Sequence, residues 1–406
     1  MTEILDVLIT LFALPVLGMS LYLAMLAWMA RRSGGPPETA EAQTVPFDIV
    51  VPAHNEALGI AGTVQSLLEL DYPRELFRVL VVADNCEDAT AEKAREAGAE
   101  VLVRKDTEKR GKGYALELAF GKSAKKGFAK AVVVVDADTF VSKNLLRVFA
   151  AKMAEGAGAM QAHYGVLNPM ASWRTRLMTL ALALFNDLRS LGRERLGLST
   201  GLKGNGMCFT HALLRTVPHQ AYSVVEDLEY GIRLGEAGYR VHYAEEAVVK
   251  GEMVSSEKAS RSQRRRWEGG RLQMARRYAR PLLRRALAER SMMLFDLGFD
   301  LLIPPLTYLV VAAFGLTLFT LFGSLVDQGL LLLSTPTMLV ADVALLVYVL
   351  RGWRLSGVGA RGLLDLMWAP VFVVWKLRLL LSRADHPKNA WVRTAREGES
   401  RIEPGP

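Results

Sequence analysis

The chain has 406 residues, of which 51% are hydrophobic, and a mean hydropathy of +0.17, which is high for a soluble enzyme and indicates segments in lipid. Lys and Arg outnumber Asp and Glu by 50 to 42, and a net charge of +8 suits an anionic membrane surface or an anionic substrate. The two cysteines, Cys86 and Cys208, are far apart and argue against a disulfide framework or a zinc site.

An apolar run opens the chain. Residues 4–30 are nearly uncharged and long enough to cross about 30 Å of hydrocarbon, and Arg31 and Arg32 follow at once. Acidic rather than basic residues lead the run, which argues against a cleaved signal peptide. We therefore expect a transmembrane helix over 1–32 with its N-terminus outside, followed by a polar, proline-rich linker over 33–46.

A polar domain is expected over 47–290, where β-branched runs alternate with helical segments. The runs DIVVPA, RVLVVADN and KAVVVVDADT form a βαβ series, which predicts a parallel sheet. Ligands of open parallel sheets bind beyond the carboxyl ends of the strands. The polar residues that would meet at this edge are Asn55 and Glu56, Asp84, and Asp136 to Asp138.

Asp136 and Asp138 follow four consecutive valines at a predicted strand end. A site rich in Asp can hold a nucleotide diphosphate only if a divalent cation lies between the carboxylates and the phosphates. Mg²⁺ and Mn²⁺ take oxygen ligands of this type, so the pair predicts a metal site. The ordinary alternative is an Asp-x-Asp pair on a surface loop.

Six fragments in chain order resemble motifs of family 2 glycosyltransferases. They are VPAHNEA, VVADNCEDAT, KRGKGYAL, DAD, VED and QRRRW. The resemblance covers residues 46–277 and is closest to the membrane-bound branch, which includes cellulose, hyaluronan and poly-N-acetylglucosamine synthases and ceramide glucosyltransferases. It implies an α/β fold of the GT-A type, with a Rossmann-like domain that binds a nucleotide sugar and flanking transmembrane and interfacial helices.

The resemblance also implies roles for single residues. The donor would be bound by Pro52, Asn55, Glu56, Asp84, Lys112 and Asp136. Asp138, with Asp136, would hold Mg²⁺ or Mn²⁺. Asp227, beside Glu226, would take the proton from the acceptor hydroxyl. Arg266 would stabilise the departing diphosphate, because a guanidinium is always charged and matches phosphate geometry. The residues expected to close over the diphosphate and the acceptor are Gln263, Arg266 and Trp267.

Further apolar runs follow the polar domain, at 304–323 and 330–350. The loop between them lacks Lys and Arg, whereas arginines follow the second run, so the polar domain should be cytoplasmic. Charged residues interrupt the stretch 363–381, for which we expect an interfacial or re-entrant helix. Residues 291–382 are thus expected to form transmembrane and interfacial helices, and 383–406 a basic cytoplasmic tail.

The expected function is inverting, metal-dependent transfer of a sugar from a UDP-sugar to a polysaccharide or membrane-linked acceptor, with a β-linkage. The QRRRW motif favours polymer formation in exopolysaccharide or cell-surface glycan synthesis. Single transfer to a polyprenyl phosphate or ceramide-like lipid remains an alternative, as does a non-catalytic membrane scaffold, which the intact Asp138, Asp227 and Arg266 oppose. Nucleic acid is not an expected partner, since lipid accounts for the positive charge. Export or accessory subunits remain open.

Overall fold

The computed structural model describes residues 2–32, 44–251, 253, 257–326 and 333–368. Its central feature is a mixed sheet of eight strands in the order β3-β2-β1-β4-β7-β6-β8-β5. The strands are β1 (Phe47–Ala53), β2 (Phe77–Asp84), β3 (Glu100–Arg104), β4 (Ala131–Val134), β5 (Thr139–Val141), β6 (Ala159–Val166), β7 (Met207–Thr210) and β8 (Val241–Gly251).

The predicted parallel sheet is correct for only part of the chain. Strands β1 to β4 pair in parallel, as the βαβ series requires, and β6 is parallel to β8. However, β7 is antiparallel to both β4 and β6, and β5 is antiparallel to β8. These two strands have only four and three residues, too few to show a strand pattern in the sequence.

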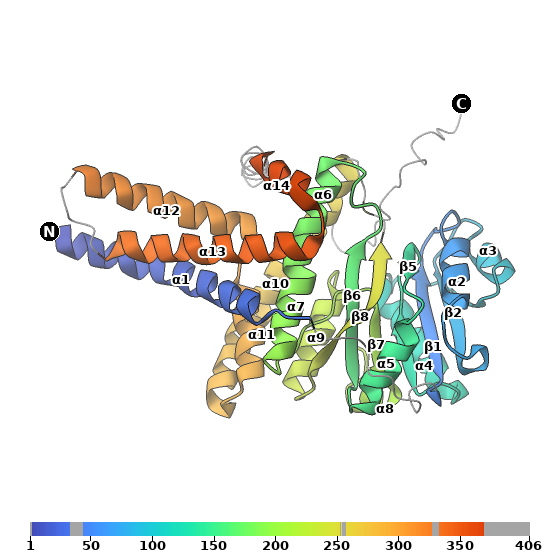
Figure 1. Ribbon diagram of the computed structural model, residues 1–406. Coiled ribbons are helices and arrows are strands. Elements are labelled where there is room, and N and C mark those ends of the chain that lie inside the picture. The colour runs from blue at the N-terminus through green and yellow to red at the C-terminus, as the bar shows by residue number, and fades with distance from the viewer. Residues whose placement is uncertain (1, 33–43, 252, 254–256, 327–332, 369–406) are drawn as a thin grey trace.

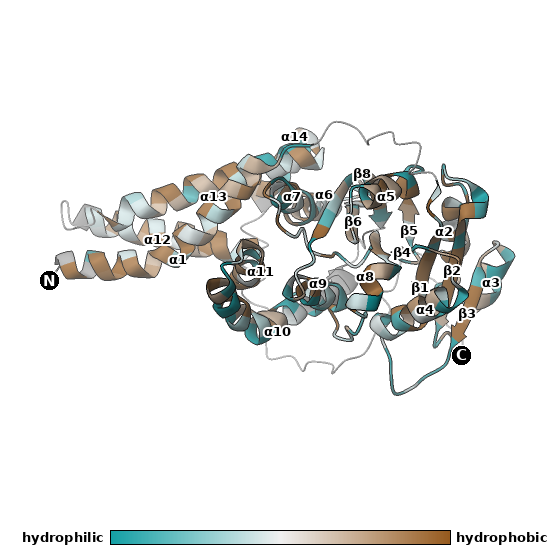
Figure 2. Ribbon diagram, turned by 90° about the horizontal axis from the view of Figure 1, so that it is seen from below, coloured by the Kyte–Doolittle hydropathy of each residue, from teal (hydrophilic) through white to brown (hydrophobic). Residues whose placement is uncertain are grey.

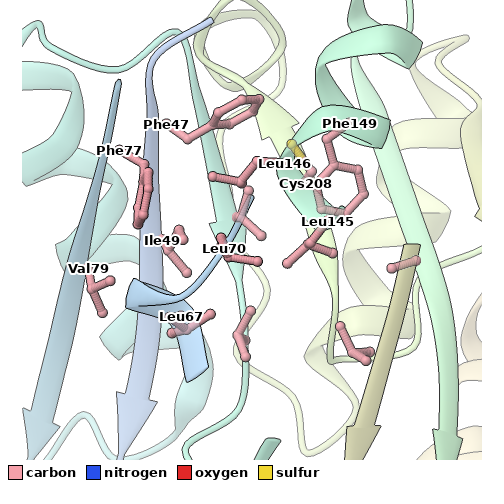
Figure 3. Close-up of a cluster of buried hydrophobic side chains, with 14 of the residues drawn as sticks. Phe47, Ile49, Leu67, Leu70, Phe77, Val79, Leu145, Leu146, Phe149 and Cys208 are labelled. Atoms are coloured by element: carbon pink, nitrogen blue, oxygen red, sulfur yellow. The ribbon is translucent and has the colours of Figure 1, made fainter. Parts of the chain in front are cut away.

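Helices cover both faces of the sheet (Figure 1). On one face, α2 (Ile60–Leu68) and α5 (Leu145–Ala154) enclose the larger core with β1, β2 and β4, as Figure 3 shows for Phe47, Phe77 and Phe149. Each of these three rings is almost completely buried, which contributes about 1.5–3 kcal/mol apiece relative to exposure. The helix α3 (Thr90–Glu96) lies beside α2. On the other face lie α4 (Lys112–Lys126), α8 (His211–Thr216) and α9 (Glu226–Glu236).

A second group of helices adjoins the sheet domain on one side. The helix α6 (Trp173–Leu182) continues through a π-helical turn, η3 (Ala183–Leu188), into α7 (Arg189–Arg195). The long α10 (Glu257–Glu289) packs against α11 (Met292–Leu302), and both contact α9. The break between α10 and α11 coincides with the predicted boundary at 290, where Arg290 takes a left-handed φ of 51°.

Three long helices project together from this group: α1 (Thr2–Met29), α12 (Leu306–Val326) and α13 (Ser334–Ser356) (Figure 1). They are apolar along most of their length (Figure 2) and leave large side chains such as Phe12 and Phe322 exposed. By length and composition, Asp6–Met29 and Leu306–Ser324 are long and apolar enough to cross a membrane.

Several of the predicted boundaries shift or fall outside the described residues. The run predicted over 330–350 is seen as α13, which begins at Ser334 and extends to Ser356. The short α14 (Gly359–Asp365) and η4 (Leu366–Trp368) lie at the start of the stretch 363–381. The rest of that stretch, the tail 383–406 and residues 33–43 of the linker lie outside the described part.

Candidate active site

A cavity of about 1080 Å³ lies at the carboxyl ends of β1 and β4 and reaches the long helices α12 and α13. Most of the predicted site residues line it. These are Pro52, Glu56, Lys112, Asp136, Asp138, Glu226, Asp227, Arg266 and Trp267. The volume exceeds the roughly 300–1,000 Å³ of a pocket for one small ligand, so the cavity has room for two substrates.

Asp84 ends β2 behind this cavity and is not part of its wall. Its side chain is fully buried, and its Oδ1 accepts hydrogen bonds from Arg104 Nη1 (2.7 Å) and Asn85 Nδ2 (3.0 Å). Burial raises the pKa of Asp84, and the neighbouring Arg104 only partly opposes this effect. The other oxygen, Oδ2, is buried and has no hydrogen-bond partner in the described part of the chain. It is therefore a buried acceptor whose hydrogen-bonding capacity is not fully used among the described residues.

Asn55 has a structural role at the carboxyl edge of the sheet. It takes a left-handed φ of 56°, which Asn tolerates, and its Oδ1 accepts a hydrogen bond from the Glu87 N–H at 2.8 Å. The next backbone N–H, of Glu56, donates to Thr90 Oγ1 at 2.8 Å. Asn55 thus joins the end of β1 to the loop after β2 and does not line the cavity, whereas Glu56 does.

Lys112 stands at the start of α4 and connects three parts of the site. Its ammonium donates to Asp136 Oδ1 (2.5 Å) and to the Gly204 carbonyl (2.6 Å), and it lies 3.8 Å from Glu226 Oε1. Burial lowers the pKa of Lys112, but the carboxylates of Asp136 and Glu226 outweigh it and the pKa is raised. Lys112 therefore stays charged and brings the Asp-x-Asp loop and the start of α9 together.

Asn205 holds the Asp-x-Asp loop in place from the opposite side. Its Oδ1 accepts from the Asp136 backbone N–H (3.1 Å), and its Nδ2 donates to Thr139 Oγ1 (2.7 Å). Tyr164 of β6 faces the same loop, and burial together with Asp136 and Asp138 raises the pKa of its hydroxyl.

Asp136 and Asp138 are a donor set that fits Mg²⁺ or Mn²⁺, since both cations prefer carboxylate oxygens. Within the described ranges there is no group of three or more His, Cys, Asp or Glu side chains placed to hold a metal ion. Two protein carboxylates leave most of an octahedral shell open. Phosphate oxygens of a bound nucleotide and water would have to complete it, as is usual for Mg²⁺ at phosphate sites.

Glu226 and Asp227 form the first residues of α9, where backbone N–H groups point out of the helix. Asp227 Oδ1 accepts from the Leu228 N–H at 2.8 Å. Burial raises the pKa of Asp227, and it raises that of Glu226 to about 7 although Lys112 acts in the opposite direction. A carboxylate with a pKa raised toward neutrality is suited to take a proton from a hydroxyl.

Gly204 packs directly against Asp227. It has a φ of +81°, and a Cβ built on it would lie 3.3 Å from Asp227 Oδ2 and 3.8 Å from Lys112 Nζ. The glycine therefore serves two needs, a left-handed backbone and close approach to the carboxylate.

The predicted clamp lies on α10. Arg266 and Trp267 line the cavity, together with Glu268 and Arg271 of the same helix. Gln263 lies about one turn earlier on α10, and its side chain falls outside the described part of the chain.

The sequence analysis missed a second group of cavity residues around Phe185 of η3. Lys203 Nζ, the Arg189 guanidinium and the Arg271 guanidinium lie 4.5, 5.0 and 5.5 Å from the centre of this ring. Asp300 Oδ1 of α11 accepts from Arg189 Nη1 at 3.1 Å, and its Oδ2 accepts from Arg271 Nη2 at 3.0 Å. The charges of Arg189 and Lys203 inside largely apolar or Gly-rich segments were the signal available in the sequence.

Residues 45–270, more than half of the chain, match the family described as glycosyltransferase like family 2. The chain belongs to this family. The expected enzyme class, a glycosyltransferase, is thereby confirmed.

Two curated relatives illustrate the range of this glycosyltransferase family. The chain is 23% identical over 260 residues to a probable glycosyltransferase, YdaM, of Bacillus subtilis, with 62% of this chain and 60% of that protein covered. It is 30% identical over 246 residues to a beta-monoglucosyldiacylglycerol synthase of Synechocystis, with 58% of this chain and 50% of that protein covered. The chain thus spans about half to three fifths of the length of these relatives.

The fold is also similar to that of a solved mannosyltransferase. The mannosyltransferase PcManGT from Pyrobaculum calidifontis, in complex with GDP-Man and Mn²⁺, superposes with a TM-score of 0.50 and 17% sequence identity. The superposition covers 85% of this chain and 99% of that chain. The expected α/β fold of the glycosyltransferase type is therefore confirmed, with the mixed sheet described above.

Proposed function

We propose that this glycosyltransferase moves a sugar from a UDP-sugar to a hydroxyl acceptor at a membrane, with inversion at the anomeric carbon. The observation that carries the proposal is the position of Asp227. It is a carboxylate with a raised pKa at the start of α9, and it lines the same cavity as the Asp-x-Asp pair and Arg266.

In this mechanism Asp227 accepts the proton of the acceptor hydroxyl as the oxygen attacks the anomeric carbon. The bond from that carbon to the diphosphate breaks on the opposite face, so an α-linked donor gives a β-glycoside. Glu226 positions Asp227 and shares the charge of Lys112. Arg266 lines the cavity where negative charge builds up on the departing diphosphate, and a guanidinium stabilises such charge well.

The donor would lie across the carboxyl edge of the sheet. Pro52, Glu56 and Lys112 would support the ribose and diphosphate from the cavity wall, and Asp84, buried at the end of β2, would act on the uracil pocket through its hydrogen bond with Arg104. Asn55 would act indirectly, through the loop that it holds. Asp136 and Asp138 would hold a divalent cation, which neutralises charge on the diphosphate when bound.

The proposed location is an integral membrane position with the catalytic domain in the cytoplasm. The two apolar spans in α1 and α12 support a membrane anchor. Arg31 and Arg32 after the first span, and the arginines after Leu350, support a cytoplasmic catalytic domain and an external N-terminus. Polymer formation stays a prediction of the QRRRW motif.

The test separates catalysis from binding. Asp227→Asn keeps shape and hydrogen-bonding capacity but cannot take a proton, so turnover should fall by about 10²-fold or more. UDP binding, measured by calorimetry, should stay close to that of the unaltered protein. Asp71→Asn, which removes an exposed carboxylate paired with Arg147, is the matched control and should leave both quantities unchanged. Equal losses of UDP binding and turnover in Asp227→Asn would show that Asp227 is structural.

A further inference from the structure

The cavity has a second half that the transfer step does not use. Residues 201–204 of one loop line both parts of the cavity. Gly204 faces the catalytic side, where it contacts Asp227 and Lys112. Lys203, the preceding residue, faces the other side and lies 4.5 Å from the centre of the Phe185 ring. Gly204, beside Asp227, and Lys203, beside Phe185, are thus consecutive residues of the chain.

The second half carries more positive than negative charge. Three arginines converge on the single carboxylate of Asp300, with Arg193 Nη2 at 2.7 Å from Oδ1 in addition to Arg189 and Arg271. Arg193 is also paired with Asp296 at 2.9 Å. These ion pairs join α7, α10 and α11, so a structural role accounts for the arginines.

Ion pairs between helices do not account for the position of Lys203. It lines the cavity, and among the described residues it forms no ion pair with a carboxylate. Burial lowers its pKa to about 7, and the neighbouring Arg193 acts in the same direction. A positive group in such surroundings is costly unless an anion satisfies it. The position therefore suits an anionic ligand group that arrives with the substrate.

The wall beyond these cations is apolar and aliphatic. It is formed by Leu177 and Met178 of α6, Leu301 of α11, Ile303 just after α11, and Leu306 and Val310 at the start of α12. Pro304 and Pro305, between α11 and α12, also line it. Since α12 contains one of the two candidate spans, this wall continues into the apolar helices. Aliphatic surface of this kind matches acyl chains through the hydrophobic effect.

We infer that the acceptor of this glycosyltransferase is a single anionic phospholipid whose headgroup carries a free hydroxyl. Its phosphate would pair with Lys203, its acyl chains would lie against the α6, α11 and α12 wall, and its hydroxyl would reach Asp227. A hydroxyl is favoured over a bare lipid phosphate as the nucleophile because an alcohol needs a base, whereas a phosphate anion does not. The inference rests on the proposed function and selects one lipid in place of the predicted polymer.

The step balances with the groups already named. The headgroup oxygen forms a bond to the anomeric carbon, and the bond from that carbon to the diphosphate oxygen breaks. UDP leaves with the electron pair, and the hydroxyl proton passes to Asp227. Lys203 takes no part in bond making and acts as a positioning residue for the lipid phosphate.

The test compares acceptors of defined charge. Purified full-length protein is incubated with a panel of UDP-sugars and phosphatidylcholine vesicles that carry phosphatidylglycerol, diacylglycerol or polyprenyl phosphate at equal mole fraction. UDP release and product mass are measured. We expect a singly glycosylated phosphatidylglycerol, with kcat/KM at least about tenfold above that for diacylglycerol, since a hydrogen bond to a charged group gives an advantage of this size.

Variants assign this preference to Lys203. Lys203→Met should raise the KM for phosphatidylglycerol at least about tenfold and leave the KM for the UDP-sugar and the KM for diacylglycerol unchanged. Lys203→Arg should keep most of the preference. The control is Lys250→Met, which removes an exposed lysine of β8 that does not line the cavity and should change nothing. If Lys203 had a purely structural role, Lys203→Met would instead lower the rates of transfer to both acceptors together.

The possible failures are distinguishable. Equal use of the two lipids, a polymer product, or better transfer to vesicles with polyprenyl phosphate would overturn the inference and leave the proposed function standing. Binding of UDP without sugar transfer to any of these acceptors would overturn the proposed function itself. The comparison of acceptors with the unaltered protein needs no variant, so it decides the matter even if Lys203→Met does not fold.

Discussion

A single methyl group beside Asp227, the proposed base, should separate effects on stability from effects on catalysis. Gly204→Ala places a Cβ 3.3 Å from Asp227 Oδ2, a contact that requires the carboxylate to move by a few tenths of an ångström. It also places an alanine at a φ of +81°, which costs roughly 1–2 kcal/mol of stability for a left-handed residue. A misplacement of about 1 Å at a reacting group can cost about 10²-fold in rate, so a shift of a few tenths should lower kcat by about three- to tenfold.

The matched control is Gly127→Ala, at the end of α4. Gly127 has a φ of +65°, and a Cβ on it meets nothing within 4 Å. Gly127→Ala therefore introduces the same kind of backbone strain without displacing a neighbouring atom. Thermal unfolding should show a similar loss of stability for the two variants, whereas kcat at saturating donor and acceptor should fall only for Gly204→Ala. Equal kcat values for the two variants would refute the close packing of Gly204 against the base.

Three further predictions concern the pH dependence, the metal and the membrane topology. Because burial raises the pKa of Asp227 above its usual value, Asp227 becomes protonated sooner as the pH falls, so kcat measured against pH should fall on the acid side at a higher pH than an ordinary Asp carboxylate would give. An acid limb near pH 4 would contradict this. Asp138→Asn should raise the concentration of Mg²⁺ or Mn²⁺ needed for transfer while the protein stays folded, and EDTA should abolish transfer by the unaltered enzyme; full turnover in EDTA would exclude the metal role. A reporter fused after Arg32 should be active only in a cytoplasmic format, and one inserted near residue 327 only in an external format; the reverse pattern would exclude the proposed topology.

The sequence predicted the parallel half of the sheet well because its signals are local. The strands β1, β2 and β4 are apolar runs with a polar residue at or just past the end, and each is separated from the next by enough chain for a helix. The antiparallel strands β5 and β7 could not be recognised in this way. Their place depends on pairing with β8 and with β4 and β6, which are distant in the sequence.

The same contrast holds for the site. The motif residues Asp136, Asp138, Glu226 and Asp227 could be named because each belongs to a short pattern of its own. Lys203 carries no such pattern, because its significance depends on Phe185 and on the arginines around Asp300, which only tertiary packing brings to it. Conversely, the motif suggested donor contact for Asn55, and the structure shows a hydrogen bond to a neighbouring loop instead.

The contact between α1 and α7 determines how far from the lipid surface Asp227 lies. Gly192 of α7 lies so near Leu26 of α1 that a Cβ on it would be 2.5 Å from the Leu26 carbonyl oxygen. The Tyr22 hydroxyl of α1 accepts from Arg193 at 2.7 Å and donates to Asp296 at 2.6 Å. With α1 in a bilayer, these contacts would hold α7 and α11 against the anchor, and α11 packs against α9, which carries Asp227. Asp227 would then stand at a constant height above the lipid surface, and the length of the headgroup would decide which hydroxyls it can deprotonate.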